Sequence, residues 1–307
     1  MKNYHQIILA AAGLLVLGSS SCNFQQPQQS QQNAIASMEA PKKEQANPLL
    51  NIDLPESFTF CGEKVKMEDI DVRERFDREL YVNTFWHSST ILMLKRANRW
   101  LPVIEEVLKE EGVPEDFKYL SMIESGLQNV VSPAGARGFW QFLSGTAKDY
   151  GLTVNGEVDE RYHVEKSTRA ACSYLKEAKD KLGSWTLAAA AYNRGVNGVR
   201  KALNEQKADD YYDLLLNEET SRYLFRILAI KMIHSDPQQY GFDLNDRVLY
   251  TQERLKYEKV EQSISDLPAY AQEKGISYKL LKRYNPWLRD SKLTLKNGES
   301  YLIALPR

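Results

Sequence analysis

The sequence predicts a mainly α-helical protein with a small α+β unit at its C-terminus. Apolar residues recur at helical spacing through much of 67–235, and little of that region alternates as a strand does. The pattern breaks after Asp236-Pro237, and the tail then shows a short alternating run, two short helical stretches and a final apolar strand at 300–305. With 307 residues and 43% apolar composition, the chain can bury at least one sizeable core.

An export signal is predicted at residues 1–21. The positive charge of Lys2 precedes an apolar run at 7–18, and small residues at 19–21 lead into Cys22. Because this run is too short to span a bilayer comfortably, a cleaved signal is favoured over a membrane helix. The small residues before Cys22 also resemble a bacterial lipoprotein signal, in which the cysteine is diacylated and becomes the lipid anchor. An ordinary signal that is cut elsewhere is the alternative.

The segment 22–52 is expected to be a flexible tether. It is rich in Gln, Ser, Asn and Pro, and it holds too few large apolar residues to offset the entropy lost on ordering. The same composition would also suit a passive spacer.

Residues 53–111 are expected to form an N-terminal helical extension, because helical periodicity runs from about Met67 until Gly112 and Pro114 stop it. Pro114 then opens a second helix, and Gly126 suits the position just after its end. After a Pro/Gly-rich turn, further helices are predicted at 141–150, 164–182, 186–192 and 218–235.

The composition argues against nucleic acid and against metal. The 40 basic and 41 acidic residues leave a net charge of −1, which supplies no overall field for holding DNA or RNA. The four histidines lack the spacing of a metal site or a Ser-His dyad, and no CxxC motif occurs. We therefore expect neither a metal nor a cofactor. Cys61 and Cys172 leave both one disulfide and two separate thiols open.

Glu124 is the candidate acid. It lies at the predicted C-terminal end of an amphipathic helix, where unpaired carbonyl groups disfavour a carboxylate. The apolar neighbours Met122 and Ile123 add desolvation, which also raises the pKa of a carboxyl group. A carboxylic acid that must stay protonated near neutral pH requires such surroundings. Taken alone, a single glutamate at a helix end is more often a solvated surface residue than a catalyst.

Separated blocks around Glu124 resemble one enzyme family. In chain order they are Glu124-Ser125-Gly126, SPAGARGFWQF at 132–142, VDER at 158–161, AAAYNRG at 189–195 and ETSRY at 219–223. They resemble the catalytic domain of lytic transglycosylases with the goose-lysozyme-like fold, in particular the membrane-bound lytic murein transglycosylase D type. The resemblance implies a lysozyme-like helical catalytic domain, which we expect at 112–240.

The resemblance also implies roles for single residues. Glu124 matches the family's catalytic acid/base, and Tyr223 matches a late tyrosine that faces the catalytic carboxyl group. Substrate binding is implied for Ser125, Gln141, Tyr192, Asn193 and Tyr223. Trp140 and Tyr192 are candidates for stacking on sugar rings, with core packing as the alternative.

Other positions in the blocks are interpreted as structural. Asp159 and Glu160 are expected to stabilise their loop as partners of Arg161 rather than to act as catalysts. Arg137 and Arg194 stand where family members often carry a small residue, which changes contacts in the cleft more than the chemistry.

The implied reaction cleaves the glycan strands of peptidoglycan without water. Most glycosidases use a pair of carboxyl groups. In this family the 6-hydroxyl of N-acetylmuramic acid attacks instead, so Glu124 first donates and then reclaims a proton. The product is a 1,6-anhydromuramoyl end. The alternatives are a lysozyme-like muramidase that uses water and a non-catalytic lipoprotein that only binds the cell wall.

The tail at 255–307 resembles a degenerate LysM module, whose family role is to bind glycans that contain N-acetylglucosamine. Asn285, Pro286, Gly298 and Leu302 fit that pattern. The usual Gly-Asp before the first helix is missing, so a purely structural unit is the alternative.

The expected partners are peptidoglycan glycan strands and, through lipidated Cys22, a membrane. The expected location is the bacterial cell envelope, facing the periplasm. Asn23 after the cysteine favours the outer membrane. The sequence gives no indication of the oligomeric state.

Overall fold

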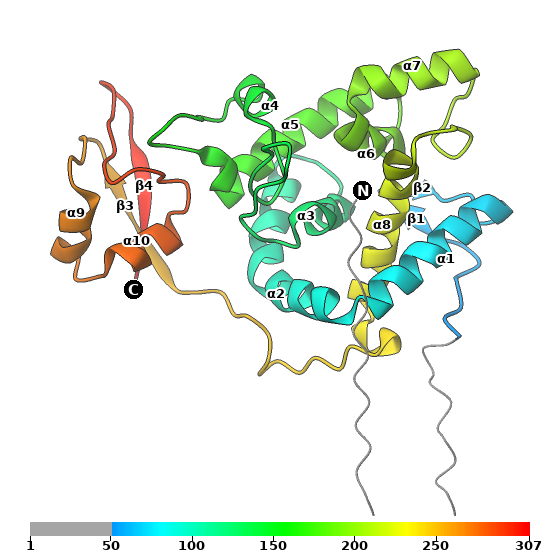
Figure 1. The fold of residues 1–307 in the computed structure, drawn as a ribbon, viewed down its shortest axis with the longest axis horizontal. Coiled ribbons are helices and arrows are strands. Elements are labelled where there is room, and N and C mark those ends of the chain that lie inside the picture. Colours follow the sequence, from blue (N-terminus) through cyan, green and yellow to red (C-terminus); the bar gives the residue numbers. More distant parts are fainter. Residues whose placement is uncertain (1–50) are drawn as a thin grey trace, which may run out of the picture. The chain divides into compact units, whose positions relative to one another are not determined.

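The computed structural model describes residues 51–307 (Figure 1). The expected signal at 1–21, Cys22 and nearly all of the tether therefore lie outside the described residues. Within the described part, none of the helices has both the length and the apolar character needed to cross a membrane.

Helices dominate the described residues, which confirms the fold class predicted from the sequence. The α-helices before residue 240 are α1 (Ile70–Phe85), α2 (His87–Glu110), α3 (Lys118–Ser125), α4 (Ser144–Asp149), α5 (Val164–Leu182), α6 (Trp185–Arg194), α7 (Val196–Gln206) and α8 (Glu218–Ser235). Short 3-10 helices are η2 (Glu115–Phe117), η3 (Glu160–Tyr162) and η4 (Pro237–Tyr240). The tail comprises β3 (Leu255–Val260), α9 (Leu267–Glu273), α10 (Tyr278–Tyr284) and β4 (Tyr301–Pro306).

Some sequence predictions were wrong in detail. The helix expected at 141–150 begins only at Ser144, because Gln141 has a φ of 48°, which no α-helix accommodates. The helix α7 was not predicted, since two glycines near its start, Gly195 and Gly198, weaken the helical pattern. The predicted bounds of α5 and α8 agree with the structure.

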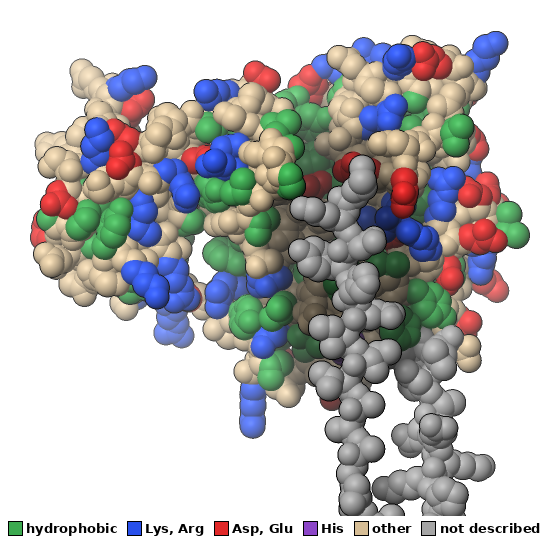
Figure 2. All heavy atoms as spheres, in the orientation of Figure 1, with side chains coloured by type: hydrophobic (Ala, Val, Ile, Leu, Met, Phe, Trp, Pro, Cys, Tyr) green, Lys and Arg blue, Asp and Glu red, His purple; other side chains and the backbone are tan. Residues whose placement is uncertain are grey.

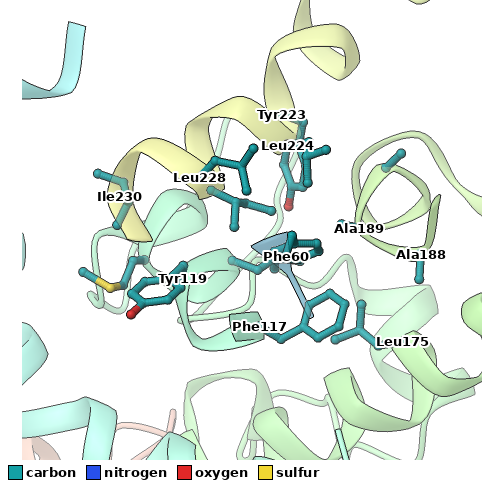
Figure 3. Close-up of a cluster of buried hydrophobic side chains, with 14 of the residues drawn as sticks. Phe60, Phe117, Tyr119, Leu175, Ala188, Ala189, Tyr223, Leu224, Leu228 and Ile230 are labelled. Atoms are coloured by element: carbon teal, nitrogen blue, oxygen red, sulfur yellow. The ribbon is translucent and has the colours of Figure 1, made fainter. Parts of the chain in front are cut away.

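The helix α8 lies at the centre of the helical part and contacts α1, α3 and α6. Figure 3 shows Tyr223, Leu224 and Leu228 of α8 directed into the same apolar cluster as Phe60 and Phe117. These five side chains are all 2% exposed or less. Burial of this kind contributes roughly 1.5–3 kcal/mol per large side chain, so α8 is fixed by packing rather than by helix propensity.

A short hairpin ties the N-terminal part to this core. Its strands, β1 (Thr59–Phe60) and β2 (Glu63–Lys64), are antiparallel, and the turn between them uses positive φ values at Cys61 (54°) and Gly62 (80°). The carboxylate of Glu63 accepts hydrogen bonds from the backbone N–H groups of Trp185 (2.7 Å) and Thr186 (2.8 Å). The hairpin therefore caps the N-terminus of α6, where a negative charge is favourable.

The tail is a small α+β unit in which β3 and β4 pair antiparallel, with Tyr257 opposite Ala304. Its own apolar cluster includes Leu267, Leu281, Trp287 and Ile303. Charged side chains of both signs are interspersed on the face drawn in Figure 2.

Candidate functional site

Glu124 lies in the last turn of α3. Gly126 ends this helix in the left-handed conformation (φ 59°) and donates its N–H to the carbonyl of Met122 at 2.8 Å. The Nε of Arg96 donates to the carbonyl of Gly126 at 2.6 Å. These hydrogen bonds fix the C-terminal end of α3. The half-buried side chain of Glu124 projects from this end.

Tyr223 of α8 faces Glu124 directly. Its hydroxyl donates a hydrogen bond to Oε1 of Glu124. Burial raises the pKa of Glu124 above its usual range, and the Tyr223 hydrogen bond and the Arg226 charge oppose that rise. Burial also raises the pKa of Tyr223 far above its usual value, so this phenol keeps its proton. The pair therefore consists of a carboxyl group that favours its protonated form and a permanent donor beside it.

Two further charged residues of α8, Arg226 and Glu219, act on the carboxyl group of Glu124. Arg226 donates through Nη2 to the carbonyl of Ile123 at 3.0 Å, which joins α8 to α3 one residue before Glu124. The exposed carboxylate of Glu219 pushes the pKa of Glu124 upward by charge repulsion. Sequence reasoning did not single out Arg226 or Glu219. Arg226 follows Tyr223 by three residues, so the spacing on one helical face was the available signal.

Ser125 connects α3 to the loop 135–142. Its hydroxyl donates to the carbonyl of Phe139 at 3.0 Å and lies 3.2 Å from that of Ser121. Gln141 belongs to this loop and donates through Nε2 to the carbonyls of Gly138 (2.7 Å) and Val130 (3.2 Å). Both side chains therefore donate hydrogen bonds to backbone carbonyl groups. The amide oxygen of the half-buried Gln141 can still accept a hydrogen bond.

Tyr192 and Asn193 come from the end of α6. The hydroxyl of Tyr192 donates to the carbonyl of Trp140 at 2.8 Å, and the Glu124 charge adds to burial in raising the pKa of Tyr192. Asn193 donates to Oε1 of Glu219 at 2.9 Å and accepts from the hydroxyl of Thr220 at 2.8 Å. The structure thus gathers Glu124, Tyr192 and Tyr223 in one electrostatic group and binds Asn193 to the start of α8.

Trp140 packs in the core of the helical part. Its ring is fully buried (0% exposed) and its indole N–H donates to Thr168 Oγ1 at 2.8 Å. Core packing, the alternative in the sequence analysis, is the outcome. Arg194 lies at the end of α6 and reaches Asn217 Oδ1 at 3.2 Å.

Asp159 and Arg161 form the expected pair, with Nη2 to Oδ2 at 2.7 Å and Nε to Oδ1 at 2.8 Å. Glu160 departs from the expectation. It binds Lys166 and the N–H of Thr153 instead of Arg161, because η3 turns its side chain toward the start of α5.

A cavity of about 380 Å³ has a lining that does not include Glu124. Trp100 and Arg99 of α2 line one side, and Tyr257 and Leu302 of the tail line another. Among the described residues no cluster of His, Cys, Asp and Glu has the arrangement of a metal site, and Cys61 and Cys172 are both free thiols.

The helical fold and the Glu124–Tyr223 pair define a lysozyme-like helical domain. Comparison with known proteins identifies it further: residues 102–215 match the model of the Transglycosylase SLT domain, and residues 256–307 match the Soluble lytic transglycosylase C-terminal LysM-like domain. The chain thus carries a transglycosylase SLT domain followed by a LysM-like domain. The SLT match ends before α8, so Tyr223 lies beyond the matched residues.

Individual relatives agree with this assignment. The membrane-bound lytic murein transglycosylase D of Escherichia coli strain K12 is 30% identical over 257 residues, which are 80% of this chain and 55% of that protein. The protein of the same name in Escherichia coli O6:H1 strain CFT073 gives the same figures. A putative tributyltin chloride resistance protein of Alteromonas sp. strain M-1 is 29% identical over 114 residues, 36% of this chain and 55% of that protein. The chain therefore spans about half the length of these relatives.

Proposed function

We propose that this protein is a peptidoglycan lytic transglycosylase. It cleaves the β-1,4 bond between N-acetylmuramic acid and N-acetylglucosamine and leaves a 1,6-anhydromuramoyl end. The observation that carries the proposal is the hydrogen bond from Tyr223 to Glu124, a carboxyl group whose pKa is raised by burial. A general acid needs this combination of a held proton and a fixed orientation. The SLT domain match and the similarity to proteins named membrane-bound lytic murein transglycosylase D support the reaction class.

In the proposed reaction Glu124 acts twice. Its carboxyl group gives a proton to the glycosidic oxygen as the bond from that oxygen to the anomeric carbon breaks, and N-acetylglucosamine leaves with a free 4-hydroxyl. The 6-hydroxyl of N-acetylmuramic acid then bonds to the anomeric carbon, and the carboxylate of Glu124 takes its proton. The enzyme returns to its starting state, and no water enters the product.

Tyr223 stabilises the carboxylate form of Glu124 that exists after proton donation. Its hydroxyl donates to Glu124, and a hydrogen bond of this type is stronger when the acceptor is a carboxylate. The carboxylate that forms after proton donation is thus stabilised where desolvation would otherwise penalise it. Arg226 adds a positive charge that acts in the same direction.

Substrate binding is assigned to residues around this pair. We assign this role to Ser125 and Gln141, which bond to or belong to the loop 135–142, and to Asn193 with Glu219, which are bonded to each other at the end of α6 and the start of α8. Amide and hydroxyl groups suit the N-acetyl and hydroxyl groups of a sugar. Tyr192 contributes the edge of its half-buried ring, since its hydroxyl is already engaged by Trp140.

A muramidase on the same scaffold is the second candidate, and Glu219 is the observation that favours it. The charge of Glu219 raises the pKa of Glu124, so the two carboxyl groups interact. An inverting hydrolase needs a second carboxylate to activate water. We assign Glu219 to binding, because the amide of Asn193 already holds its carboxylate. The third candidate, a wall-binding lipoprotein without catalysis, is less favoured because the carboxyl group and its tyrosine donor are both in place.

Digestion of purified sacculi in ¹⁸O-labelled water separates these candidates. A transglycosylase releases anhydro fragments without ¹⁸O, and a muramidase releases reducing ends that each carry one ¹⁸O atom. Binding of sacculi without release of fragments at any pH would reject both enzymes.

We also propose that Cys22 anchors the protein to the membrane of a bacterial envelope, with the outer membrane favoured, and that 22–52 tethers the domains to it. The sequence pattern before Cys22 supports this, and the transglycosylase D relatives are named as membrane-bound. The substitution Cys22→Ala is expected to move the protein from the membrane fraction to the soluble periplasmic fraction. An unchanged distribution would contradict lipidation.

A further inference from the structure

The C-terminal unit is joined to the helical part by backbone pairing. Residues 157–159 run antiparallel to 287–289, with Val158 bridging Leu288. The N–H of Asp159 donates to the carbonyl of Trp287 at 2.9 Å, and the N–H of Arg289 donates to that of Glu157 at 2.7 Å. These bonds pair the chain segment before η3 with the loop between α10 and β4.

Side chains strengthen the same junction. The carboxylate of Glu157 accepts from the N–H of Thr294 at 2.7 Å and pairs with Nζ of Lys292 at 3.1 Å. Val158 (3% exposed) and Tyr162 (4% exposed) belong to the apolar cluster of the C-terminal unit and not to the main core. The cluster is therefore completed by residues of the other domain, which an independently moving binding module would not need.

The segment that docks the C-terminal unit also supports the loop 135–142. The guanidinium of Arg161 is paired with Asp159, and its Nη1 donates to the carbonyls of Gly135 (3.3 Å) and Phe142 (3.2 Å). Asp159 and Arg161 are only 1% and 4% exposed. A buried guanidinium that is paired with a carboxylate fixes geometry, because loss of that carboxylate would leave a buried charge unpaired.

Gly138 shows how closely the loop is seated. It has a φ of 78°, and a Cβ placed on it would lie 1.9 Å from the carbonyl oxygen of Arg161. The loop 135–142 thus rests directly on the backbone of η3.

The same loop reaches the Glu124 site from its other side. Phe139 accepts from Ser125, the neighbour of Glu124, and Trp140 accepts from Tyr192. Gln141 lies in the loop itself. A continuous set of contacts therefore runs from Thr294 and Leu288, through 157–161, to the loop that bonds to Ser125 and Tyr192.

We infer that the C-terminal LysM-like unit positions the loop 135–142, with Glu157 and Val158 as the positioning residues that transmit its support. The unit thus has a role inside the enzyme that does not require it to capture glycan. Glu124 and Tyr223 themselves make none of these contacts, so we expect support of the loop to affect substrate binding and to leave the acid itself in place. The kinetic consequence rests on the proposed transglycosylase function, whereas the structural consequence does not.

The test uses the full chain with Val158→Asp, which places a charge in the shared apolar cluster, and Glu157→Ala, which removes the bonds to Thr294 and Lys292. The matched control is Glu258→Ala, which breaks an ion pair with Lys274 (2.8 Å) elsewhere in the C-terminal unit. Glu157→Gln is the conservative variant, since its amide oxygen still accepts from Thr294.

Hydrogen exchange measured by mass spectrometry is the first readout. Val158→Asp and Glu157→Ala are expected to speed amide exchange in 135–142 and 157–163 by roughly tenfold, while α3 and α8 stay protected. Glu258→Ala is expected to leave 135–142 unchanged, and Glu157→Gln to restore most of its protection. Unchanged exchange in 135–142 for both docking variants would overturn the inference, whether or not the protein cleaves peptidoglycan.

Turnover of isolated glycan strands is the second readout. For the two docking variants we expect KM to rise roughly tenfold, with kcat and the pH at which kcat declines both close to wild type. A fall in kcat at unchanged KM, or a shift of that pH, would show that the C-terminal unit acts on Glu124 and not on the loop. Absence of turnover in the wild type would contradict the proposed function and leave the exchange result to decide the inference.

Discussion

The hydroxyl of Tyr223 donates a hydrogen bond to Oε1 of Glu124 from a position 99 residues later in the chain. The bond joins α8 to the last turn of α3 at a half-buried carboxyl group. Three features of the fold make this contact: the cap at Gly126 ends α3, packing holds α8, and Arg226 bonds α8 to the carbonyl of Ile123.

Tyr223→Phe is expected to lower kcat by roughly 10- to 100-fold, because a hydrogen bond to a charged group contributes about 1.5–3 kcal/mol. Tyr223 lowers the pKa of Glu124, so its removal raises that pKa further. Activity needs the protonated acid and is lost as pH rises through the pKa of Glu124. The high-pH decline of kcat should therefore move to higher pH, and pH–rate profiles check this. A shift toward lower pH would contradict the assigned hydrogen bond.

Glu124→Gln is expected to stabilise the fold near neutral pH. Burial raises the pKa of Glu124 in the folded state, so its contribution to stability is full below the unfolded pKa and is lost as pH rises through the folded one. Glutamine has no such loss. Thermal unfolding should show a higher Tm for Glu124→Gln at pH 8 and a difference that vanishes toward pH 4. An equal difference at both pH values would mean that ionisation is not its cause.

Glu219→Gln separates a binding role from a catalytic one. If Glu219 only holds Asn193 and contacts substrate, kcat changes less than tenfold, because the glutamine side chain still accepts the Asn193 hydrogen bond. The loss of its negative charge also lowers the pKa of Glu124, so the high-pH decline moves to lower pH. A loss of kcat comparable to that of Glu124→Gln would instead identify a two-carboxylate hydrolase.

His163 makes the fold sensitive to acid. It caps α5, and burial, helped by the charge of Lys166, lowers its pKa to about 4. A histidine with a lowered folded pKa stabilises the protein above its unfolded pKa and loses this contribution as pH falls toward 4. His163→Asn keeps a capping side chain without a proton to gain. Between pH 6.5 and pH 4, the Tm of the wild type should therefore fall more steeply than that of His163→Asn. Parallel curves would contradict this.

The sequence predicted the features that depend on local signals. Gly126 marked the end of α3, and the long amphipathic segments marked α5 and α8. The position of Glu124 at a helix end followed from this. The hairpin at 59–64 escaped notice because its strands have two residues each, too few for an alternating pattern.

What the residues alone did not predict are contacts between distant segments. The pairing of Tyr223 with Glu124 came from the family resemblance, because no local pattern links the two positions. Trp140 was an open choice between cleft and core, and only the packing around Thr168 decides it. The support of the loop 135–142 by Arg161 was not predictable from local pattern, since Gly138 is one glycine of a Pro/Gly-rich turn and its contact with Arg161 joins distant segments.

The most direct test of the account compares wild type, Glu124→Gln and Glu205→Gln on purified sacculi, with the masses of released fragments as the readout. Glu205 is an exposed glutamate of α7 and serves as the matched control. We predict anhydro fragments from wild type and from Glu205→Gln, and a loss of release of roughly 10²–10⁴-fold for Glu124→Gln. Release of anhydro fragments by Glu124→Gln at the wild-type rate would contradict the assignment of Glu124 as the acid/base.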